Sequence, residues 1–217
     1  MKQLFVFLTM TLIAFSQDTL YVDGAASGAN DGTNWVNAYD SLQVALANAS
    51  NGDQIWIAKG VYKVTSSANR DTSFILPNSL SLELYGGFTS GATDISTRDL
   101  KNDSSILSGD IGVQGLSSDN THHILRVNAN SAYKRIDGLH FFDGNANGGS
   151  IITGGAFLIT GAASGKIEIR NSSFTRNRAD EAGAIHVNGG SAKVFILNSN
   201  FANNDADGIA GEKRKRV

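Results

Sequence analysis

Short apolar stretches separated by Gly, Asn, Asp and Ser run along most of this chain, and each has the length and period of a β-strand. The clearest, Ser79–Tyr85, places three leucines on one face and Ser, Glu and Tyr on the other, and we expect Gly86-Gly87 to end it. Strands this short, with little chain left for crossover helices, do not suit a doubly wound α/β sheet. The other expected strands are Gln54–Ala58, Val61–Val64, Ser105–Leu107, Ile124–Val127 and Arg135–Leu139.

One segment has a helical period instead. Asp40 and Ser41 offer N-cap oxygens, and an apolar stripe at three- and four-residue spacing then runs to Asn51-Gly52. The stripe consists of Leu42, Ala45, Leu46 and Ala49. We therefore predict a helix at about residues 41–49 that covers another part of the fold.

An internal repeat indicates how the strands are arranged. Residues 166–180 match residues 193–207 at a constant offset of 27, and residues 154–157 match residues 182–185 at an offset of 28. A weaker copy begins at Arg135. Repeats of this length with short strands and Gly/Asn turns are typical of solenoids. The sequence thus predicts an all-β fold, a right-handed parallel β-helix with an N-terminal capping α-helix.

Stacking of like side chains follows from this arrangement. Ile167 and Ile169 should point inward and stack on Val194 and Ile196, and Asn177 and Asn204 should form a side-chain ladder at a turn, as should the Asn of a third copy, Phe142–Asn145. Two antiparallel hairpins in a sandwich would also explain the alternation. They would not explain the constant offset.

Composition excludes some classes of protein. The chain has 24 glycines, one proline and no cysteine, so turns are frequent and no disulfide stabilises the fold. A net charge of −2 gives no indication of a nucleic-acid partner. We expect the basic cluster in the tail 208–217 to be a solvated end.

The N-terminus predicts export. Lys2 precedes an apolar run from Leu4 to Phe15, which is shorter than the roughly 20 residues that span a bilayer. Small residues at Ala14 and Ser16 complete the pattern of a signal peptide, residues 1–16. A buried N-terminal strand or helix is the alternative. The expected organisation is then a cap with the first strands at 17–64 and β-helix coils at 65–207, with no transmembrane segment in the mature chain.

Two families resemble this sequence. The Phe-x-x-Asn motifs at Phe174–Asn177 and Phe201–Asn204, with the segments Gly154–Phe157 and Ala182–Ile185, resemble repeats of polymorphic outer-membrane proteins. The stretch from Tyr21 to Tyr62 is similar to the start of exported right-handed β-helix proteins of the pectate-lyase-like superfamily. The resemblance implies the fold, the capping role of the helix and a secreted protein at the extracellular or outer-membrane surface of a bacterium. It implies no single activity, because this fold carries many.

A polysaccharide lyase would need clustered carboxylates for Ca²⁺ and a basic residue to take a proton. Arg98 and Arg126 are candidate bases. The candidate carboxylates are Asp94, Asp99, Asp103, Asp110 and Asp119. They lie on irregular connections without a common register, so solvated loop acids are the preferred interpretation. No catalytic residue of the family can be matched here.

A glycoside hydrolase would need two carboxylates on either side of the sugar bond. Asp137 and Glu168 lie in comparable parts of neighbouring coils and are the candidates, with Arg126 as a weak third catalytic candidate. A pair of outward acids on a solvated sheet face is the alternative. His122-His123 is a poor metal site because adjacent strand residues point to opposite faces.

Aromatic residues could form a sugar-stacking platform, although packing is the usual role of such side chains. The candidates are Trp35, Trp56, Tyr85 and Tyr133. The last repeat places Phe195 and Leu197 outward, where the previous copy has Glu168 and Arg170. Two outward apolar side chains need a cover, and no apolar cap follows Asp207. We therefore expect self-association through this end, or a shortened form of a longer surface protein.

The leading interpretation is a non-catalytic, adhesin- or passenger-like module that contacts polysaccharide or a cell-surface protein. It needs no cofactor. The alternative is an extracellular polysaccharide lyase or glycoside hydrolase acting on acidic polysaccharide, and Ca²⁺ is expected only for the lyase.

Overall fold

The strands of this protein pair only in parallel throughout the described residues of the computed structural model, which are 17–128, 132–161, 165–189 and 191–208. The prediction of a mainly β chain with parallel strands and one α-helix is confirmed. The predicted signal peptide and residues 209–217 of the predicted basic tail lie outside these residues. No helix in the described part of the chain is long and apolar enough to cross a membrane.

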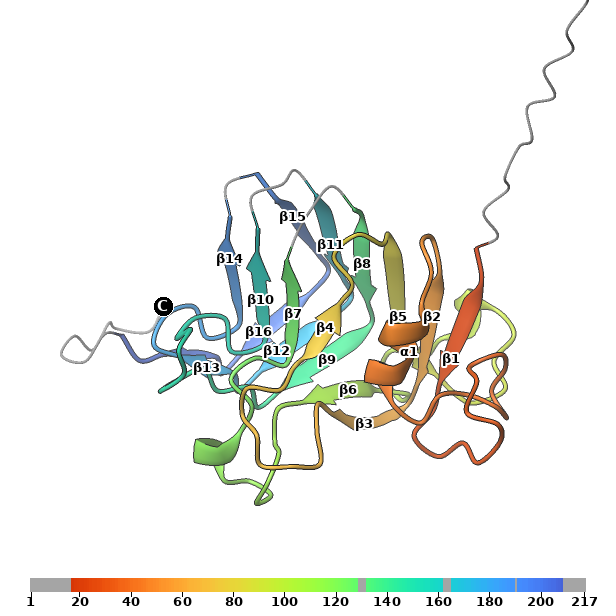
Figure 1. Ribbon diagram of the computed structural model, residues 1–217, viewed down its shortest axis with the longest axis horizontal. Helices are drawn as coiled ribbons and strands as arrows, with labels where there is room; N and C mark the ends of the chain where they lie inside the picture. The colour runs from red at the N-terminus through yellow and green to blue at the C-terminus, as the bar shows by residue number, and fades with distance from the viewer. Residues whose placement is uncertain (1–16, 129–131, 162–164, 190, 209–217) are drawn as a thin grey trace, which may run out of the picture.

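Three sheets contain most of the strands (Figure 1). The first sheet consists of β1 (Thr19–Val22), β2 (Gln54–Ala58), β5 (Leu82–Phe88), β8 (Lys134–Asp137), β11 (Lys166–Arg170) and β15 (Lys193–Leu197). The second consists of β3 (Gly60–Lys63), β6 (Ser105–Ser108), β9 (Leu139–Phe142), β12 (Ser173–Thr175) and β16 (Asn200–Ala202). The third consists of β4 (Phe74–Leu76), β7 (Leu125–Asn128), β10 (Phe157–Thr160) and β14 (Ile185–Asn188), and β13 (Arg178–Ala179) pairs separately with β17 (Asp205–Ala206).

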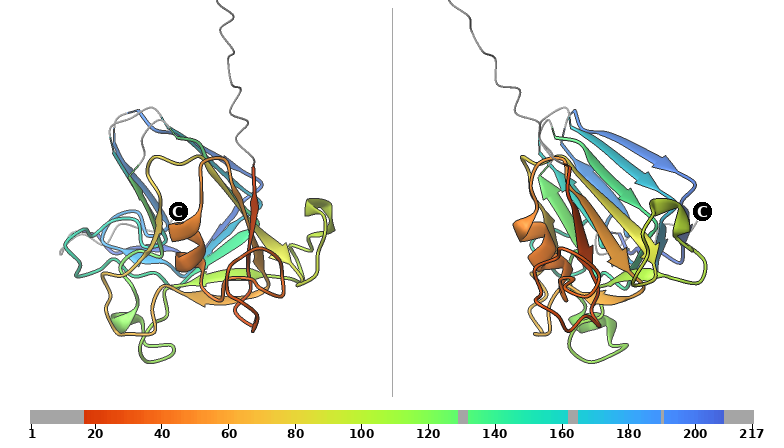
Figure 2. Two further views of the ribbon diagram at one scale, coloured as in Figure 1. Left: turned by 45° about the vertical axis from the view of Figure 1, so that its right-hand side comes forward. Right: turned by 90° about the vertical axis from the view of Figure 1, so that its right-hand side faces the viewer.

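The chain visits the three sheets in turn and then returns to the first, as β2, β3 and β4 followed by β5, β6 and β7 show. We call each such passage a circuit. Each circuit pairs with the one before it, so the sheets grow strand by strand in chain order. In Figure 2 the three sheets surround a common interior. The side chains that face this interior form one apolar core from the first circuit to the last.

Like residues stack within this core. Ile167 and Ile169 are fully buried, and their neighbours in β15 are Val194 and Ile196. The rings of Phe141, Phe174 and Phe201 lie nearly parallel, with centroids 4.6 and 4.8 Å apart. Because the sheets are parallel and in register, each inward position repeats one circuit later.

The repeat offsets predict the strand register. Lys166 pairs with Lys193 and Phe174 with Phe201, an offset of 27 residues, whereas Phe157 pairs with Ile185, an offset of 28. The Asn ladder is also present, because the Asn177 amide donates to Oδ1 of Asn204 at 3.0 Å. Its predicted third member was wrong by one residue. Phe174 aligns with Phe141, and Gly144, not Asn145, donates its backbone N–H to Asn177.

Helix α1 (Leu42–Asn48) lies at the N-terminal opening of the interior (Figure 2). Its buried residues, Leu42, Ala45 and Leu46, join the core and include three of the four residues of the predicted stripe. The expected capping bond is absent. Ser41 occupies the N-cap position in an extended conformation but makes no side-chain capping hydrogen bond.

The expectation that Gly86-Gly87 ends its strand was wrong, because β5 continues to Phe88. Trp56 pairs with Tyr85 but Ala58 pairs with Phe88, so the two glycines lie in a bulge. A Cβ on Gly86 would come within 2.4 Å of the Gly138 carbonyl oxygen, and Gly87 has a φ of +89°. Glycine therefore lets the strand bend here without ending it.

Candidate functional site

The outer face of the first sheet carries the largest set of interacting polar side chains in the article's candidate regions. The register places Gln54, Glu83, Arg135, Glu168 and Phe195 in one row across the strands. A second row, two residues further along each strand, contains Trp56, Tyr85, Asp137, Arg170 and Leu197. Neighbours in a row lie close enough to interact directly, and alternation of charge along the first row is therefore stabilising.

Glu168 lies at the centre of this face and is held as an anion. Its carboxylate accepts hydrogen bonds from the Tyr133 hydroxyl at 2.9 Å and from Arg170 Nε at 3.0 Å, and Arg135 Nη2 lies at 3.4 Å. Lys166 forms a further ion pair with it. The Lys166 bond is the main cause that lowers the pKa of Glu168 to about 2, against the opposing effect of burial, with help from Tyr133 and Arg170. The carboxyl group stays ionised at all physiological pH values.

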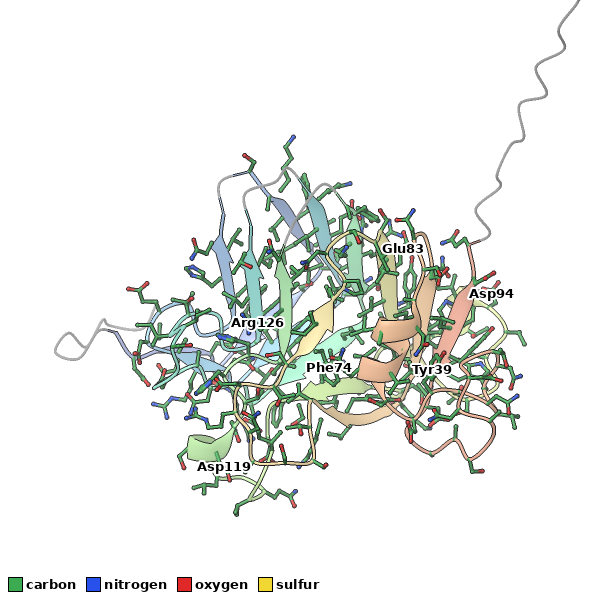
Figure 3. The ribbon with its side chains drawn as sticks, in the orientation of Figure 1. Tyr39, Phe74, Glu83, Asp94, Asp119 and Arg126 are labelled. Atoms are coloured by element: carbon green, nitrogen blue, oxygen red, sulfur yellow. The ribbon has the colours of Figure 1, made fainter. Side chains whose placement is uncertain are left out.

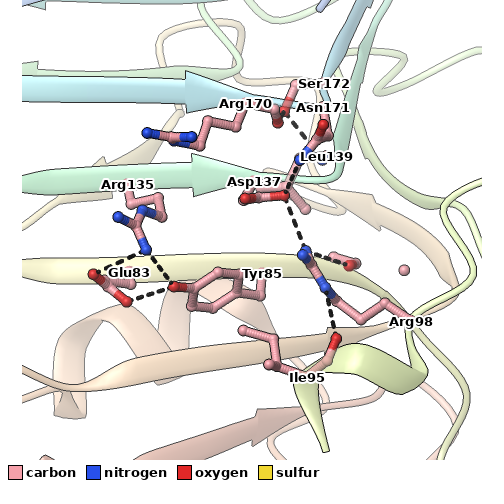
Figure 4. Close-up of polar contacts among 12 residues, drawn as sticks. Glu83, Tyr85, Ile95, Arg98, Arg135, Asp137, Leu139, Arg170, Asn171 and Ser172 are labelled. Carbon is pink, nitrogen blue, oxygen red and sulfur yellow. Dashed lines mark hydrogen bonds and ion pairs between the residues drawn. The ribbon is translucent and has the colours of Figure 1, made fainter. Parts of the chain in front are cut away.

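Glu83, Tyr85 and Arg135 form a second group one and two strands away (Figure 4). The Tyr85 hydroxyl donates to Glu83 at 2.5 Å and accepts from Arg135 Nη1 at 2.9 Å. Arg135 Nη1 also lies 3.5 Å from the Glu83 carboxylate. Burial and the bond to Glu83 raise the pKa of Tyr85. This tyrosine therefore stays protonated.

Asp137 forms the third group, with partners from outside its own strand (Figure 4). Its Oδ1 accepts from Arg98 Nη1 and from the Asn171 amide, both at 3.0 Å. Arg98 comes from the connection after β5, and its guanidinium lies 5.1 Å from the centroid of the Tyr85 ring. Arg98 thus links the second and third groups.

The acids and the bases of this face differ in exposure. The side chains of Glu83, Asp137 and Glu168 are 20%, 8% and 6% exposed. Those of Arg135, Lys166 and Arg170 are 30%, 49% and 38% exposed. Solvent therefore meets cations that lie over neutralised carboxylates.

Two aromatic rings border the exposed cations. Lys166 Nζ lies 5.5 Å from the ring centroid of Tyr133 and 5.3 Å from that of Phe195. Arg135 lies 5.6 Å from the Tyr133 centroid. Cation–π contacts of this kind hold a flexible lysine near one position.

The structure brings together two of the three predicted catalytic candidates. Asp137 and Glu168 lie on adjacent strands of the same face, but Glu168 is opposite Arg135 and Asp137 is opposite Arg170. Each carboxylate therefore has its own cationic partners. Arg126 lies on β7 in the third sheet, away from both (Figure 3).

The acidic residues considered for Ca²⁺ have local contacts. Four of them accept backbone N–H groups in their own turns: Asp94 from Ser96, Asp99 from Lys101, Asp110 from Gly115 and Asp119 from Val113. Asp103 pairs with Lys59 at 3.2 Å. Within the described ranges, no group of three His, Cys, Asp or Glu side chains lies close enough to hold a metal ion.

The two adjacent histidines have separate environments. His122 Nδ1 lies 2.9 Å from Asp71, and the buried His123 Nδ1 lies 3.0 Å from the Gly154 carbonyl oxygen. Burial is the main cause that lowers the pKa of His123 to about 4. His123 is therefore uncharged at neutral pH and acts as a packed core residue.

Three of the four aromatic candidates pack together on the N-terminal part of the same outer face. Trp56 and Tyr85 are buried with Phe88, and Trp35 packs against them from the connection after β1. Trp35 also donates its indole N–H to the Ala92 carbonyl at 2.7 Å. Tyr133 is the remaining candidate and the one that borders the exposed cations.

Sequence reasoning missed the alternating row formed by Glu83, Arg135 and Glu168. Glu83 and Arg135 pair across 52 residues, and Arg135 and Glu168 across 33, so the 27-residue repeat does not align them. The alternation of charge becomes visible only once the strand register is known. Comparison of the chain with protein-family models, with curated proteins and with solved structures found no match.

Proposed function

We propose that the three sheets are the faces of a right-handed parallel β-helix. Support comes from the parallel pairing, from the repeated order of the three sheets along the chain and from the in-register stacks of like residues. Crossovers between parallel strands of one sheet are right-handed in about 98% of cases. The finer resemblance to the pectate-lyase-like superfamily and to polymorphic outer-membrane repeats agrees with this architecture and stays part of the proposal.

We infer that this β-helix is a non-catalytic module that binds an anionic polysaccharide on the outer face of the first sheet. The observation that carries this inference is the difference in exposure between the acids and the bases of that face. Arg135, Lys166 and Arg170 present positive charge to solvent, and the aromatic rings of Tyr133 and Phe195 lie beside them. Guanidinium and ammonium groups bind carboxylate or sulfate groups, while aromatic rings pack against the apolar faces of sugars.

The state of the acids argues against the hydrolase alternative. A glycosidase needs one carboxyl group that is protonated near the working pH. The pKa of Glu168 is about 2, so this group is ionised there and is already bound by Lys166, Tyr133 and Arg170. Asp137 is likewise paired with Arg98. These carboxylates fit a role in positioning the cations above them.

The state of the bases argues against the lyase alternative. A basic residue that takes a proton needs a lowered pKa. Burial opposes the charge on Arg135, but its contacts with Tyr85 and Glu83 raise its pKa overall. We accordingly propose an exported protein at the extracellular or outer-membrane surface of a bacterium, as residues 1–16 predict.

A direct test uses the purified full chain with a uronic-acid polysaccharide and with a neutral polysaccharide of similar length. We expect binding to the acidic polymer that weakens as salt increases, and no unsaturated or reducing-end product with Ca²⁺ or with a chelator. Release of product that chelation abolishes would establish the lyase alternative. Product formed regardless of Ca²⁺ would indicate a hydrolase, and no preference for the acidic polymer would contradict the binding proposal.

A further inference from the structure

The last circuit carries a concentration of exposed apolar side chains. Of the eleven large apolar residues that are clearly exposed in the described chain, five lie between residues 187 and 201. They are Val187, Phe195, Ile196, Leu197 and Phe201, with exposed fractions of 41–45%. In the circuit before, Ile169 and Phe174, the neighbours of Ile196 and Phe201, are fully buried. These side chains are exposed because no further circuit covers them within the described residues.

The backbone of this circuit is also open on one side. β14, β15 and β16 are each the last strand of their sheets, so one edge of every strand has no strand paired with it in the part of the chain described. Unpaired edges with apolar side chains readily pair with another chain. The circuit thus offers three strand edges and an apolar surface in one plane.

The opposite end of the interior is closed. Leu42, Ala45 and Leu46 of α1 are buried in the core at the N-terminal opening. A second copy therefore cannot stack its first circuit directly on the last circuit of another. Association between copies must instead be isologous, with the two last circuits facing each other across a two-fold axis.

The sequence of β15 suits such an arrangement. A two-fold axis makes the two β15 strands antiparallel, and a register centred on Phe195 places Phe195 opposite its copy. Val194 then lies opposite Ile196, so that side chains that face the interior meet each other. Lys193 lies opposite Leu197, so no like charges are opposed.

The other two sheets meet in a compatible way. The same axis exchanges the second and third sheets, which brings β16 of one copy to β14 of the other. The inward side chains exposed there are Phe201 and Val187, at 44% and 43%. All three contacts therefore join apolar groups that face the common interior.

We infer that the last circuit is a homodimer interface, in which β15 pairs with β15 of a second copy in an antiparallel register centred on Phe195. The dimer makes the first sheets of both copies continuous. It also places the exposed cations near Phe195, including Lys166, on the two sides of the junction. This inference does not depend on the ligand of the outer face.

Sedimentation velocity over a concentration series of the full chain tests the interface. We expect a reversible monomer–dimer equilibrium in the wild type. Phe195→Glu should abolish the dimer, because two carboxylates would then face each other across the axis. The matched control is Val61→Glu, a change at an equally strand-borne and 60% exposed valine far from this end, and it should leave the equilibrium unchanged.

A mixing experiment tests the register. Phe195→Glu and Phe195→Lys should each be monomeric alone and should form a heterodimer when mixed, because the new charges are opposite across the axis. Circular dichroism of each variant establishes that it is folded. A wild type that stays monomeric at every concentration, for example because residues 209–217 cover the edge, would overturn the inference. Open-ended oligomers, or two folded variants that do not combine, would overturn the two-fold register.

Discussion

The two ends of the stacked circuits solve the same problem differently. At the N-terminal end, Leu42 and Leu46 of α1 cover the interior and are at most 1% exposed. At the other end, Ile196 and Phe201 occupy equally inward positions but are 45% and 44% exposed. Inward position alone therefore does not bury a side chain in this architecture. Each circuit depends on a cover from its neighbours, as expected for structures built from stacked units.

The strongest way to break this comparison is to truncate stacked phenylalanines in the two environments. Phe174→Ala removes a ring that lies between Phe141 and Phe201, and we expect a loss of about 3–5 kcal/mol in the free energy of unfolding. Phe201→Ala removes the same atoms from a position exposed at 44%, so about 1 kcal/mol should be lost. Urea unfolding monitored by circular dichroism at low protein concentration gives both values. Equal losses would show that the last circuit is covered.

Two lysines of the first sheet sharpen the comparison through charge. Lys134 is 2% exposed and donates to the Leu80 carbonyl, whereas Lys193 in β15 is exposed. Burial lowers the pKa of Lys134 to about 8 from 10.5, which corresponds to about 3 kcal/mol of destabilisation at neutral pH. Lys134→Met should therefore stabilise the fold by up to that amount, and Lys193→Met should have little effect.

The pH dependence of Lys134 has a definite sign. Between pH 8 and 10.5 the unfolded chain binds the lysine proton and the folded chain does not, so the contribution of this residue to stability rises with pH. The stability difference between Lys134→Met and the wild type should thus shrink across this interval. Urea unfolding at several pH values measures it, and a constant difference would contradict a charge buried without compensation.

A smaller effect is expected in the Asn ladder. Asn177 is fully buried, donates to Asn204 and to the Phe141 carbonyl, and accepts from the Gly144 N–H at 2.9 Å. Asn177→Ala should cost about 2 kcal/mol because buried partners are left unsatisfied. Asn204→Ala should cost about half as much, since one side of Asn204 is open. Thermal unfolding compares the two, and a larger loss for Asn204 would reverse the proposed direction of cover.

Much of the fold could be predicted where the repeat is regular. The offsets of 27 and 28 residues predict the pairing of β11 with β15, of β12 with β16 and of β10 with β14. Upstream, long connections after β5 and β6 change the offset, so that Leu84 pairs with Ile136 across 52 residues. The one-residue error at Phe142 has the same origin, because Gly138 separates β8 from β9 and Phe141 is the inward ring.

The candidate site was less accessible from sequence. Asp137 and Glu168 were identified as neighbours, and they do lie on adjacent strands. Their bases could not be identified, because Arg98 approaches from a connection and Tyr133 precedes its strand. Side-chain contacts of this kind depend on how loops fold back over the sheet, which no period in the sequence encodes.

The binding of an acidic oligosaccharide to the outer face tests the central claim most directly. Isothermal titration should compare the wild type with Lys166→Ala/Arg170→Ala and with Lys63→Ala, a change at an exposed lysine on the second sheet. We predict that the double substitution weakens binding of a uronic-acid oligosaccharide at least about tenfold, which corresponds to about 1.4 kcal/mol, while Lys63→Ala leaves it unchanged. Equal affinity in all three proteins, or no binding by the folded wild type, would contradict the proposed function.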